Sequence, residues 1–498
     1  MAEHPLDARP LDSELLEPQR NEQLRRVDWR FLLRSEEPPR VIDLAPGRDS
    51  EALRLVSRPA GPGEADLVLA GFPSRALLRY ARGAAAPGGE VVCRWWAPRP
   101  AGPQRAKRRL RKAGLVDVRI YWPGPQPNRQ PQFWLPLGVR AAVVYLLSKR
   151  PPRSSGEAGL RRLWRLAARF GYLAPVYVFA RVPDGEDGGS DDGNSPMLLT
   201  GGHRSINKVV ALEFGSGSPR PLTATKFARV AEAEAGVARE ATVLGRLAEE
   251  RPGAEGIPAF RERLQRGGRL GVAEGAIEGD PMLERLTPKS FPEMARRVTD
   301  LLIELAADRA GDPAQRTTID EHLGFFERHF GPALEAGQLA ALRSAARAVA
   351  ELPVVCEHRD CSPWNVVLGS RDRPVLLDWE SAEPDGLPGL DLVYFLANAG
   401  FVLEKAFEEK ATLASYRRLL DPSTPSGAVA AAETARYCEA LDLDPGLLSA
   451  LRTLCWTVHC RSDHEHLRLA AAGEPALADL RQAPFLELLS EELRRAAR

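Results

Sequence analysis

Short apolar runs of strand length alternate with amphipathic, helix-length stretches over residues 39–150. The runs are rich in Val, Leu and Ile, and each is bounded by glycine, proline or charged residues. This alternation predicts an α/β fold. The expected strands lie at 40–44, 65–70, 90–95, 116–122 and 142–147.

Beyond residue 197 the pattern changes to closely spaced strands followed by long helices, which predicts an α+β region with two lobes. The residues between the two patterns, PDGEDGGSDDGNSP at 183–196, contain no apolar side chain and predict a flexible linker. The domains that we expect are a charged leader (1–38), an α/β domain (39–182), this linker, a small sheet-rich lobe (197–279) and a helical lobe (280–498).

Charge is distributed unevenly along the chain, although the net charge is only +1. Residues 101–182 contain 17 Lys and Arg against 2 Asp and Glu, a net charge of +15. Within them, residues 160–170 have the spacing of a basic amphipathic helix. Such a helix can bind an anionic membrane surface or an acidic partner, or it can pack on a neighbouring domain. The chain lacks a recognisable nucleic-acid-binding motif, so we expect no nucleic-acid partner.

The six cysteines have no regular spacing, which favours a reducing compartment over a disulfide framework. The first 40 residues are polar and charged, unlike a signal peptide. The longest apolar run, 141–147, is far below the ~20 residues that span a bilayer. We therefore expect a cytoplasmic protein, with peripheral membrane attachment through residues 101–182 as the alternative.

Polar residues with a characteristic spacing follow two apolar runs in the segment 354–380, VVCEHRDCSPWNVVLGSRDRPVLLDWE. The first run leads into His358-Arg359-Asp360, Asn365 follows Asp360 by five positions, and the second run ends at Asp378. The spacing H-R-D-x-x-x-x-N followed by an Asp after a strand is typical of phosphoryl transfer on a kinase-like fold. A carboxylate, Asp360, can accept the proton of an attacking hydroxyl, while Asn365 and Asp378 offer oxygen ligands to Mg²⁺.

This segment resembles the aminoglycoside phosphotransferase and choline kinase branch of the kinase-like fold. That branch favours H-G-D-x-x-x-x-N and then D-x-E or D-W-E, which residues 378–380 match. Arg359 replaces the usual glycine, and an arginine at this position resembles the pattern of protein kinases. The resemblance implies ATP and Mg²⁺ as cofactors, Asp360 as the base and His358 as a brace of the loop. It also implies that the later Asp391 caps a helix and braces the loop.

The resemblance places a nucleotide-covering hairpin loop at residues 201–208, where Gly201, Gly202 and Ser205 would approach the phosphates. It places the hinge strand at 270–279, where the backbone of residues Glu274 to Ala276 would meet the adenine.

Lys226 lies at the position of the family's lysine on the third strand. Glu240, on the helix that follows, is the expected partner that fixes this lysine against the α- and β-phosphates. Glu234 is the alternative partner.

Residues 39–150 resemble the C-terminal half of a class I S-adenosylmethionine-dependent methyltransferase, a Rossmann-like fold. The likeness is weakest at the cofactor loop, where Asp43-Leu44-Ala45-Pro46-Gly47-Arg48-Asp49 retains one glycine of the family's glycine-rich pattern. We expect a truncated domain that no longer binds the cofactor.

Five Cys and His side chains gather near the C-terminal end of the chain: Cys455, His459, Cys460, His464 and His466. The pairs 455/459 and 460/464 have i, i+4 spacing, but they lie on different sides of one helix. We therefore expect ordinary helix packing in preference to a shared metal ion.

Together these patterns predict a phosphotransferase that moves the γ-phosphoryl group of ATP to a hydroxyl of a small molecule or glycan. Two alternatives stay open. One is a peptide or protein Ser/Thr kinase that modifies a natural product, which Arg359 favours slightly. The other is a non-catalytic nucleotide-binding scaffold, which the intact set of chemical residues disfavours. The richness in Ala, Arg, Gly and Pro suggests a bacterial source.

Overall fold

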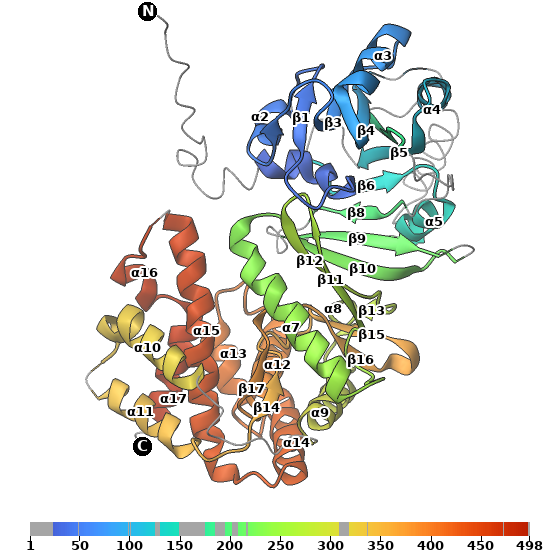
Figure 1. The fold of residues 1–498 in the computed structure, drawn as a ribbon. Helices are drawn as coiled ribbons and strands as arrows, with labels where there is room; N and C mark the ends of the chain where they lie inside the picture. Colours follow the sequence, from blue (N-terminus) through green and yellow to red (C-terminus); the bar gives the residue numbers. More distant parts are fainter. Residues whose placement is uncertain are drawn as a thin grey trace, which may run out of the picture. The chain divides into compact units, whose positions relative to one another are not determined.

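The computed structural model describes residues 23–47, 49–97, 99, 101–124, 130–148, 175–184, 195–201, 208–215, 218–307, 318–335, 337–471 and 473–496. The chain divides into two compact units. Unit 1 comprises Met1–Ala238 and Phe260–Ala276, and unit 2 comprises Arg239–Ala259 and Ile277–Arg498. Unit 1 contains the α/β region and most of the small sheet-rich lobe, and unit 2 contains the helical lobe (Figure 1).

Unit 1 is built on a single twelve-stranded sheet with the order β11-β12-β10-β9-β8-β6-β5-β7-β4-β3-β1-β2. β2, β1, β3 and β4 are parallel neighbours, and every other neighbouring pair is antiparallel. In chain order the strands are β1 (Arg40–Asp43), β2 (Arg58–Pro59), β3 (Ala65–Ala70), β4 (Ala85–Trp95), β5 (Val116–Gly124), β6 (Phe133–Pro136), β7 (Val176–Arg181), β8 (Met197–Leu199), β9 (Lys208–Phe214), β10 (Pro221–Ala228), β11 (Phe260–Arg266) and β12 (Arg269–Gly275).

β8 joins the two halves of this sheet. It pairs with β6 on one side, with Trp134 opposite Leu198, and with β9 on the other, with Leu198 opposite Ala211. Residues that the sequence assigns to two domains, 39–182 and 197–279, therefore contribute strands to the same sheet (Figure 1).

The two faces of the sheet are buried by different elements. Because successive side chains of a strand point to opposite faces, Leu67 and Leu69 of β3 enter one apolar core while Val68 and Ala70 enter the other. Helices α3 (Arg75–Ala84) and α4 (Gly102–Lys112) cover the second core. The first core is covered by residues 24–33, which include the 3₁₀ helix η2 (Arg25–Leu32), and by the short helix α2 (Ser50–Arg54).

Residues 24–33 are much more buried than a charged leader would be. Trp29 and Phe31 are both core residues of unit 1. Two charged residues on either side of Trp29, Asp28 and Arg30, are also fully buried. Arg229, directly after β10, forms an ion pair with Asp28 at 3.0 Å, and Arg30 Nη2 donates to the Arg229 carbonyl at 2.7 Å. Burial raises the pKa of Asp28 although both guanidinium groups oppose the shift.

One predicted strand is wrong. Residues 142–147 form most of helix α5 (Arg140–Ser148). A short apolar run is compatible with either structure, and here Ala142, Tyr145 and Leu146 pack together against Leu135 and Met197, as the i, i+3, i+4 spacing of a helix allows.

The amphipathic helix expected at 160–170 and residues 185–194 of the expected linker lie outside the described residues. None of the helices in the described part of the chain is both long enough and apolar enough to cross a membrane.

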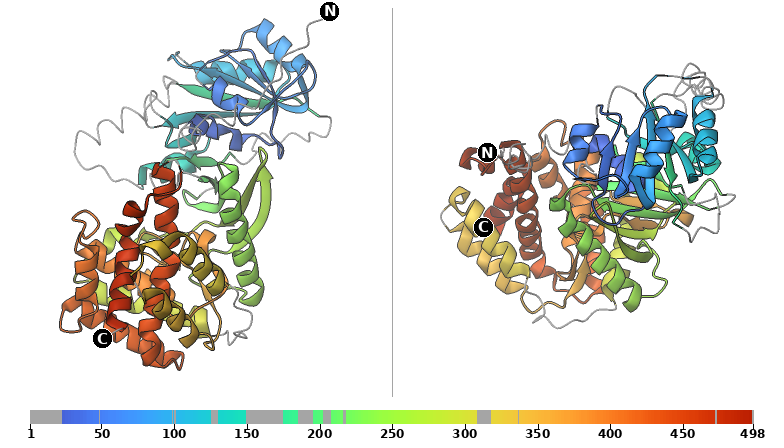
Figure 2. Two further views of the ribbon diagram at one scale, coloured as in Figure 1. Left: turned by 90° about the vertical axis from the view of Figure 1, so that its left-hand side faces the viewer. Right: turned by 45° about the horizontal axis from the view of Figure 1, so that its top comes forward.

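Unit 2 is mainly helical, as the sequence predicts for residues 283–350 and after Asp391. Its longest helix, α15, lies beside α17 (Figures 1 and 2). The helices are α7 (Glu234–Glu250, which begins in unit 1), α8 (Met282–Arg285), α9 (Phe291–Ala307), α10 (Thr318–Phe330), α11 (Gln338–Ala348), α12 (Leu390–Leu403), α13 (Thr412–Leu419), α14 (Pro425–Ala440), α15 (Leu448–Ala471), α16 (Leu477–Arg481) and α17 (Pro484–Ala496).

Two small sheets are inserted among these helices. One has the order β13-β15-β16 and the other pairs β14 with β17. Their strands are β13 (Asp280–Pro281), β14 (Val355–Glu357), β15 (Val366–Leu368), β16 (Pro374–Leu376) and β17 (Glu383–Gly386).

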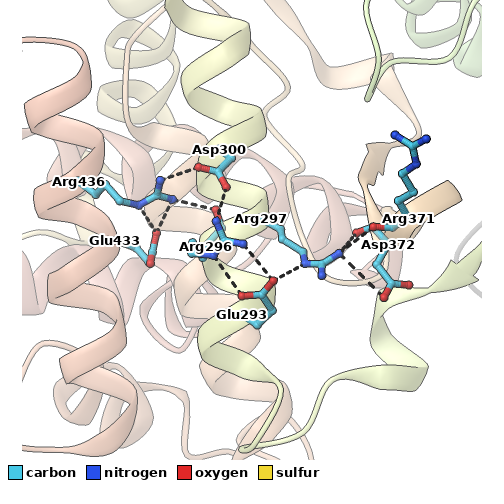
Figure 3. Close-up of polar contacts among 8 residues, drawn as sticks. All are labelled: Glu293, Arg296, Arg297, Asp300, Arg371, Asp372, Glu433 and Arg436. Atoms are coloured by element: carbon cyan, nitrogen blue, oxygen red, sulfur yellow. Dashed lines mark hydrogen bonds and ion pairs between the residues drawn. The ribbon is translucent and has the colours of Figure 1, made fainter.

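A network of ion pairs on α9 ties this helix to the β15–β16 turn (Figure 3). Arg297 donates to the carbonyls of Arg371 and Asp372 at 3.1 and 2.7 Å, and Glu293 accepts from Arg297 at 2.7 Å. On the other side of α9, Asp300 accepts from Arg436 of α14 at 2.6 Å. Exposed ion pairs contribute little stability individually, but this network fixes the turn of the hairpin that leads to Asp378.

We predict that Asp28→Asn strongly destabilises unit 1. The substitution leaves the guanidinium groups of Arg229 and Arg30 buried without a counter-charge, which costs about 3–5 kcal/mol of unfolding free energy. Urea denaturation followed by tryptophan fluorescence measures the loss. Asp66→Asn is the matched control, because it breaks an exposed pair with Arg40 and should cost less than about 1 kcal/mol. Equal losses in the two variants would contradict the prediction.

Candidate active site in unit 2

The turn His358-Arg359-Asp360 directly follows β14. β14 is fixed by its pairing with β17, where Val355 lies opposite Gly386. Arg359 adopts a left-handed conformation with φ of 63°, which bends the chain sharply after His358. The hairpin β15–β16, with Val366 opposite Leu376, then delivers Leu377 and Asp378. The sequence predicts β14 and the strand before Asp378, but it does not predict β15.

Asp360 and Asn365 are in direct contact. Asn365 Nδ2 donates to Asp360 Oδ2 at 2.7 Å and to the Asp360 carbonyl at 3.0 Å. Because the amide nitrogen of Asn365 is directed at Asp360, its oxygen Oδ1 is the atom that can serve as a metal ligand. The turn around Asn365 is closed by its own N–H, which donates to the Ser362 carbonyl at 2.9 Å.

His358 connects the turn to the strand end that precedes Asp378. Its Nδ1 accepts a hydrogen bond from the Asp360 N–H at 3.2 Å. The proton of the neutral ring is therefore on Nε2, which donates to the Leu377 carbonyl at 3.0 Å. The ring is fully buried and meets the Trp379 indole edge to face at 4.7 Å. These contacts give His358 the bracing position that the sequence predicts.

Asp391 holds the same turn from the other side. Its two carboxylate oxygens accept the backbone N–H groups of His358 and Arg359 at 2.6 and 2.8 Å. The expectation that Asp391 braces the loop is confirmed. The expectation that it caps a helix is wrong, since the N-cap of α12 is Gly389 and Asp391 lies in the first turn.

A second buried carboxylate, Glu357, shares this environment. Burial, and secondarily repulsion from Glu357, raises the pKa of Asp391 to about 7. Burial also raises the pKa of Glu357, although Arg359 opposes the shift. Arg359 pairs with Glu357 at 3.4 Å and with Glu383 at 3.6 Å. Arg359, which resembles the protein-kinase pattern in the sequence, is therefore paired with two acids next to the turn.

Asp378 is the second candidate metal ligand. Its backbone is left-handed, with φ of 70° and ψ of 64°, which is unfavourable for a residue with a side chain and is often found at functional sites. The next residue holds it in place: Trp379 N donates to Glu240 Oε1 at 3.2 Å, and Trp379 Nε1 donates to the Leu376 carbonyl at 3.0 Å. Glu380, next along the chain, accepts through its carbonyl from Arg239 at 3.4 Å.

The residues predicted to bind nucleotide are distributed over both units. Lys226 of β10 lies in unit 1 and forms an ion pair there with Glu274 Oε1 at 3.1 Å. Its predicted partner Glu240 belongs to unit 2, so that pairing stays a prediction. The Ala276 N–H donates to the Leu222 carbonyl at 3.1 Å, within the sheet. The contact of Glu274 and Ala276 with adenine also stays a prediction.

Gly201 has a packing reason for being glycine. Its N–H donates to the Gln132 carbonyl at 2.9 Å, and a Cβ at this position would lie 2.5 Å from the Cβ of Gln132. Gly202 and Ser205, the other loop residues predicted to approach phosphate, lie outside the described residues. The predicted roles of all three as phosphate contacts stay predictions.

Among the described side chains of α15, the Cys and His residues do not form one cluster. Cys455, His459 and Cys460 are buried, and the His459 ring is stacked on Tyr394 at 3.7 Å. Burial lowers the pKa of His459 to about 3, so its ring is neutral. His464 faces a different neighbourhood, with His329 and Glu474, and the His466 side chain lies outside the described residues.

The donor set of the turn suits Mg²⁺. Asn365 Oδ1 and the Asp378 carboxylate are hard oxygen ligands, which this ion prefers, and Mg²⁺ usually takes its remaining ligands from water and phosphate. The Leu377 N–H donates to the Asn365 carbonyl at 2.8 Å, which connects Asn365 to the residue that precedes Asp378.

Comparison with known proteins identifies one part of the chain. Residues 206–425 match the sequence model of the phosphotransferase enzyme family. No sequence among the curated proteins matches the chain.

Several solved structures are similar at low identity. Choline kinase LicA from Streptococcus pneumoniae is 14% identical, with 60% of this chain and 93% of that chain covered and a TM-score of 0.37. Aminoglycoside phosphotransferase APH(3'')-Id from Streptomyces rimosus is 11% identical, with 56% and 89% covered and a TM-score of 0.32. The likeness to an established enzyme family therefore lies in the sequence of residues 206–425, which include Lys226, the turn at His358 and Asp378.

Proposed function

We propose that the chain is a phosphotransferase that uses ATP and Mg²⁺ to phosphorylate a hydroxyl of a small molecule or glycan. The observation that carries the proposal is the hydrogen bond from Asn365 Nδ2 to Asp360 Oδ2. It joins the candidate base to a candidate metal ligand inside a turn that is fixed on both sides, by His358 and by Asp391. The family match over residues 206–425 supports the same function.

Each of these residues has a defined part in the reaction. The acceptor oxygen forms a bond to the γ-phosphorus, the bond from that phosphorus to the bridging oxygen breaks, and ADP leaves. Asp360 takes the proton of the acceptor hydroxyl. Mg²⁺, held by Asn365 and Asp378, would neutralise charge on the triphosphate. Lys226 would contact the phosphates, and the carboxylate of Glu274 lies within reach to orient it.

A small-molecule acceptor is favoured over a peptide. The residue that raised the peptide alternative, Arg359, is paired with Glu357 and Glu383 and serves the shape of the turn. Choline and aminoglycosides, which are named for the similar structures, are reasonable first acceptors to test.

In this proposal the α/β part of unit 1 does not carry the phosphoryl transfer. The sequence predicts a truncated methyltransferase-like domain, and we propose that its 43–49 loop does not bind a cofactor. Arg94 of β4 extends into the 43–49 loop, where Nη2 donates to the Ala45 carbonyl at 2.7 Å and Nη1 to Asp49 at 3.1 Å. Tyr177 adds a hydrogen bond to Asp49 at 2.6 Å. A protein side chain thus occupies the interior of the loop that would contact a cofactor.

We predict that Asp378→Ala weakens the binding of ATP only when Mg²⁺ is present. Loss of a carboxylate ligand should reduce the Mg²⁺-dependent affinity by about tenfold or more. Titration calorimetry with and without Mg²⁺ measures this difference. Asp479→Ala, an exposed acid on α16, is the matched control. An affinity for Mg²⁺–ATP that is unchanged in Asp378→Ala would remove Asp378 from the metal site.

Asp360→Ala should lower turnover by about 10²–10⁴-fold, because proton transfer from the acceptor is lost. The binding of Mg²⁺–ATP should change much less. Formation of ADP is measured against a panel of hydroxyl-bearing acceptors that includes choline and aminoglycosides. If Asp360→Ala turns over as fast as the wild type with any acceptor, the assignment of Asp360 as the base is contradicted.

Asp391→Asn should remove a pH dependence of stability. The folded-state pKa of about 7 is above the ordinary value of 3.8, so the folded chain retains a proton that the unfolded chain has lost. The stability that this proton contributes is complete below pH 4 and is lost as the pH rises towards 7, by up to about 1.4 kcal/mol per pH unit. The variant cannot titrate at this position. Its deficit in unfolding free energy relative to the wild type should therefore narrow between pH 5 and pH 8. A deficit that is constant or grows would contradict the assignment.

A further inference from the structure

Three side chains with metal-binding atoms meet in unit 2, at a place that the proposed reaction does not use. They are His329 near the end of α10, His464 on α15 and Glu474 in the segment between α15 and α16. One ligand atom of each lies within 4.8 Å of the other two. Among the described residues this is the one group of three such side chains at metal-binding distances.

The spacing of these atoms is close to that of a coordination sphere. His464 Nε2 lies 3.3 Å and His329 Nδ1 lies 3.8 Å from the same oxygen, Glu474 Oε2. Ligands about 2.0–2.1 Å from a tetrahedral Zn²⁺ are about 3.3 Å apart. Of the three pairs of ligand atoms, one thus already has the required separation, a second needs a shift of about half an ångström, and the two imidazole nitrogens lie within 4.8 Å of one another.

The imidazole of His464 has a buried nitrogen atom that forms no hydrogen bond. Its side chain is 5% exposed, and Nε2 is buried without a hydrogen bond even though Glu474 is near. A buried polar atom without a hydrogen bond costs free energy, and a metal ion at this position would remove that cost.

The surroundings fix the two rings and leave one side accessible. Phe325 of α10 lies 4.4 Å from the His329 ring and 5.3 Å from the His464 ring, between ring centres. Glu474 is 73% exposed at its side chain, so an ion and a water ligand can enter from solvent. The nearby Arg461, above the Phe325 ring, has a partner of its own in Glu465 at 3.4 Å.

We propose that His329, His464 and Glu474 bind a single zinc-class transition-metal ion, with water as the fourth ligand. Two imidazoles and one carboxylate are a known zinc ligand set, and imidazole also suits cobalt and nickel but not Mg²⁺. The ion connects three separate stretches of the chain: the end of α10, the interior of α15 and the segment before α16. Its role is to fasten α10 and this segment to the long helix, a role separate from phosphoryl transfer.

The test is metal binding by the full-length, untagged chain after treatment with a chelator. Zn²⁺ is titrated in competition with a colorimetric chelator, and Co²⁺ is titrated while the visible absorption of the four-coordinate ion is recorded. The wild type should bind one equivalent of each and melt at a higher temperature with Zn²⁺. Glu474→Gln and His329→Gln should bind Zn²⁺ about a hundredfold more weakly and lose the cobalt spectrum.

Two control variants make the result specific. Glu465→Gln removes an acid of α15 that faces Arg461 and should bind like the wild type. Asp378→Ala removes the proposed magnesium ligand and should also retain the zinc, which separates the two sites. Glu474 is exposed, so Glu474→Gln should fold even if a change at the buried His464 does not. The proposal is overturned if the wild type binds no Zn²⁺, or if Glu474→Gln and His329→Gln bind it as tightly as the wild type.

Discussion

The two hydrogen bonds that Asp391 accepts from the backbone of His358 and Arg359 are the contacts on which the candidate active site depends. A single carboxylate accepts two consecutive N–H groups, which forces the chain to turn between them and gives Arg359 its left-handed backbone. The turn then directs Asp360 towards Asn365 and the His358 ring towards Leu377. Three residues with different chemical roles thus take their positions from one buried acid on α12.

That acid is itself in an unfavourable place, which has a consequence for the site. Asp391 and Glu357 are both buried, and their mutual repulsion adds to the cost of burial. Arg359 offsets the cost by pairing with Glu357, whereas a glycine at this position, usual in the similar family, would have no side chain for that purpose. The departure of this sequence from H-G-D can therefore be understood as local charge balance, without a change of substrate class.

Sequence reasoning succeeded where the information is local. The motif from His358 to Asp378 has a fixed spacing within one stretch, so β14, the strand before Asp378 and the proximity of Asp360 to Asn365 could be predicted, although β15 was not. It failed where partners are distant in the chain: Asp28 with Arg229, β6 with β8, and His329 with His464 and Glu474. Residues 142–147 show a third limit, because an apolar run of that length is compatible with a strand or a helix until its neighbours are known.

The two loops that resemble cofactor sites differ in what occupies them. In the 43–49 loop of unit 1 the positive charge of Arg94 is surrounded by Asp43, Asp49 and the Ala45 carbonyl. Its charge and its hydrogen-bond donors are satisfied within the protein, and a ligand would have to displace a buried ion pair. In unit 2 Asp360 and Asp378 follow the ends of strands, and Asp360 accepts a hydrogen bond from Asn365 on a turn that His358 and Asp391 hold in place. The carboxylate and amide oxygens of this turn suit a hard cation such as Mg²⁺, which is why our proposal places the chemistry at the turn in unit 2 and not at the 43–49 loop.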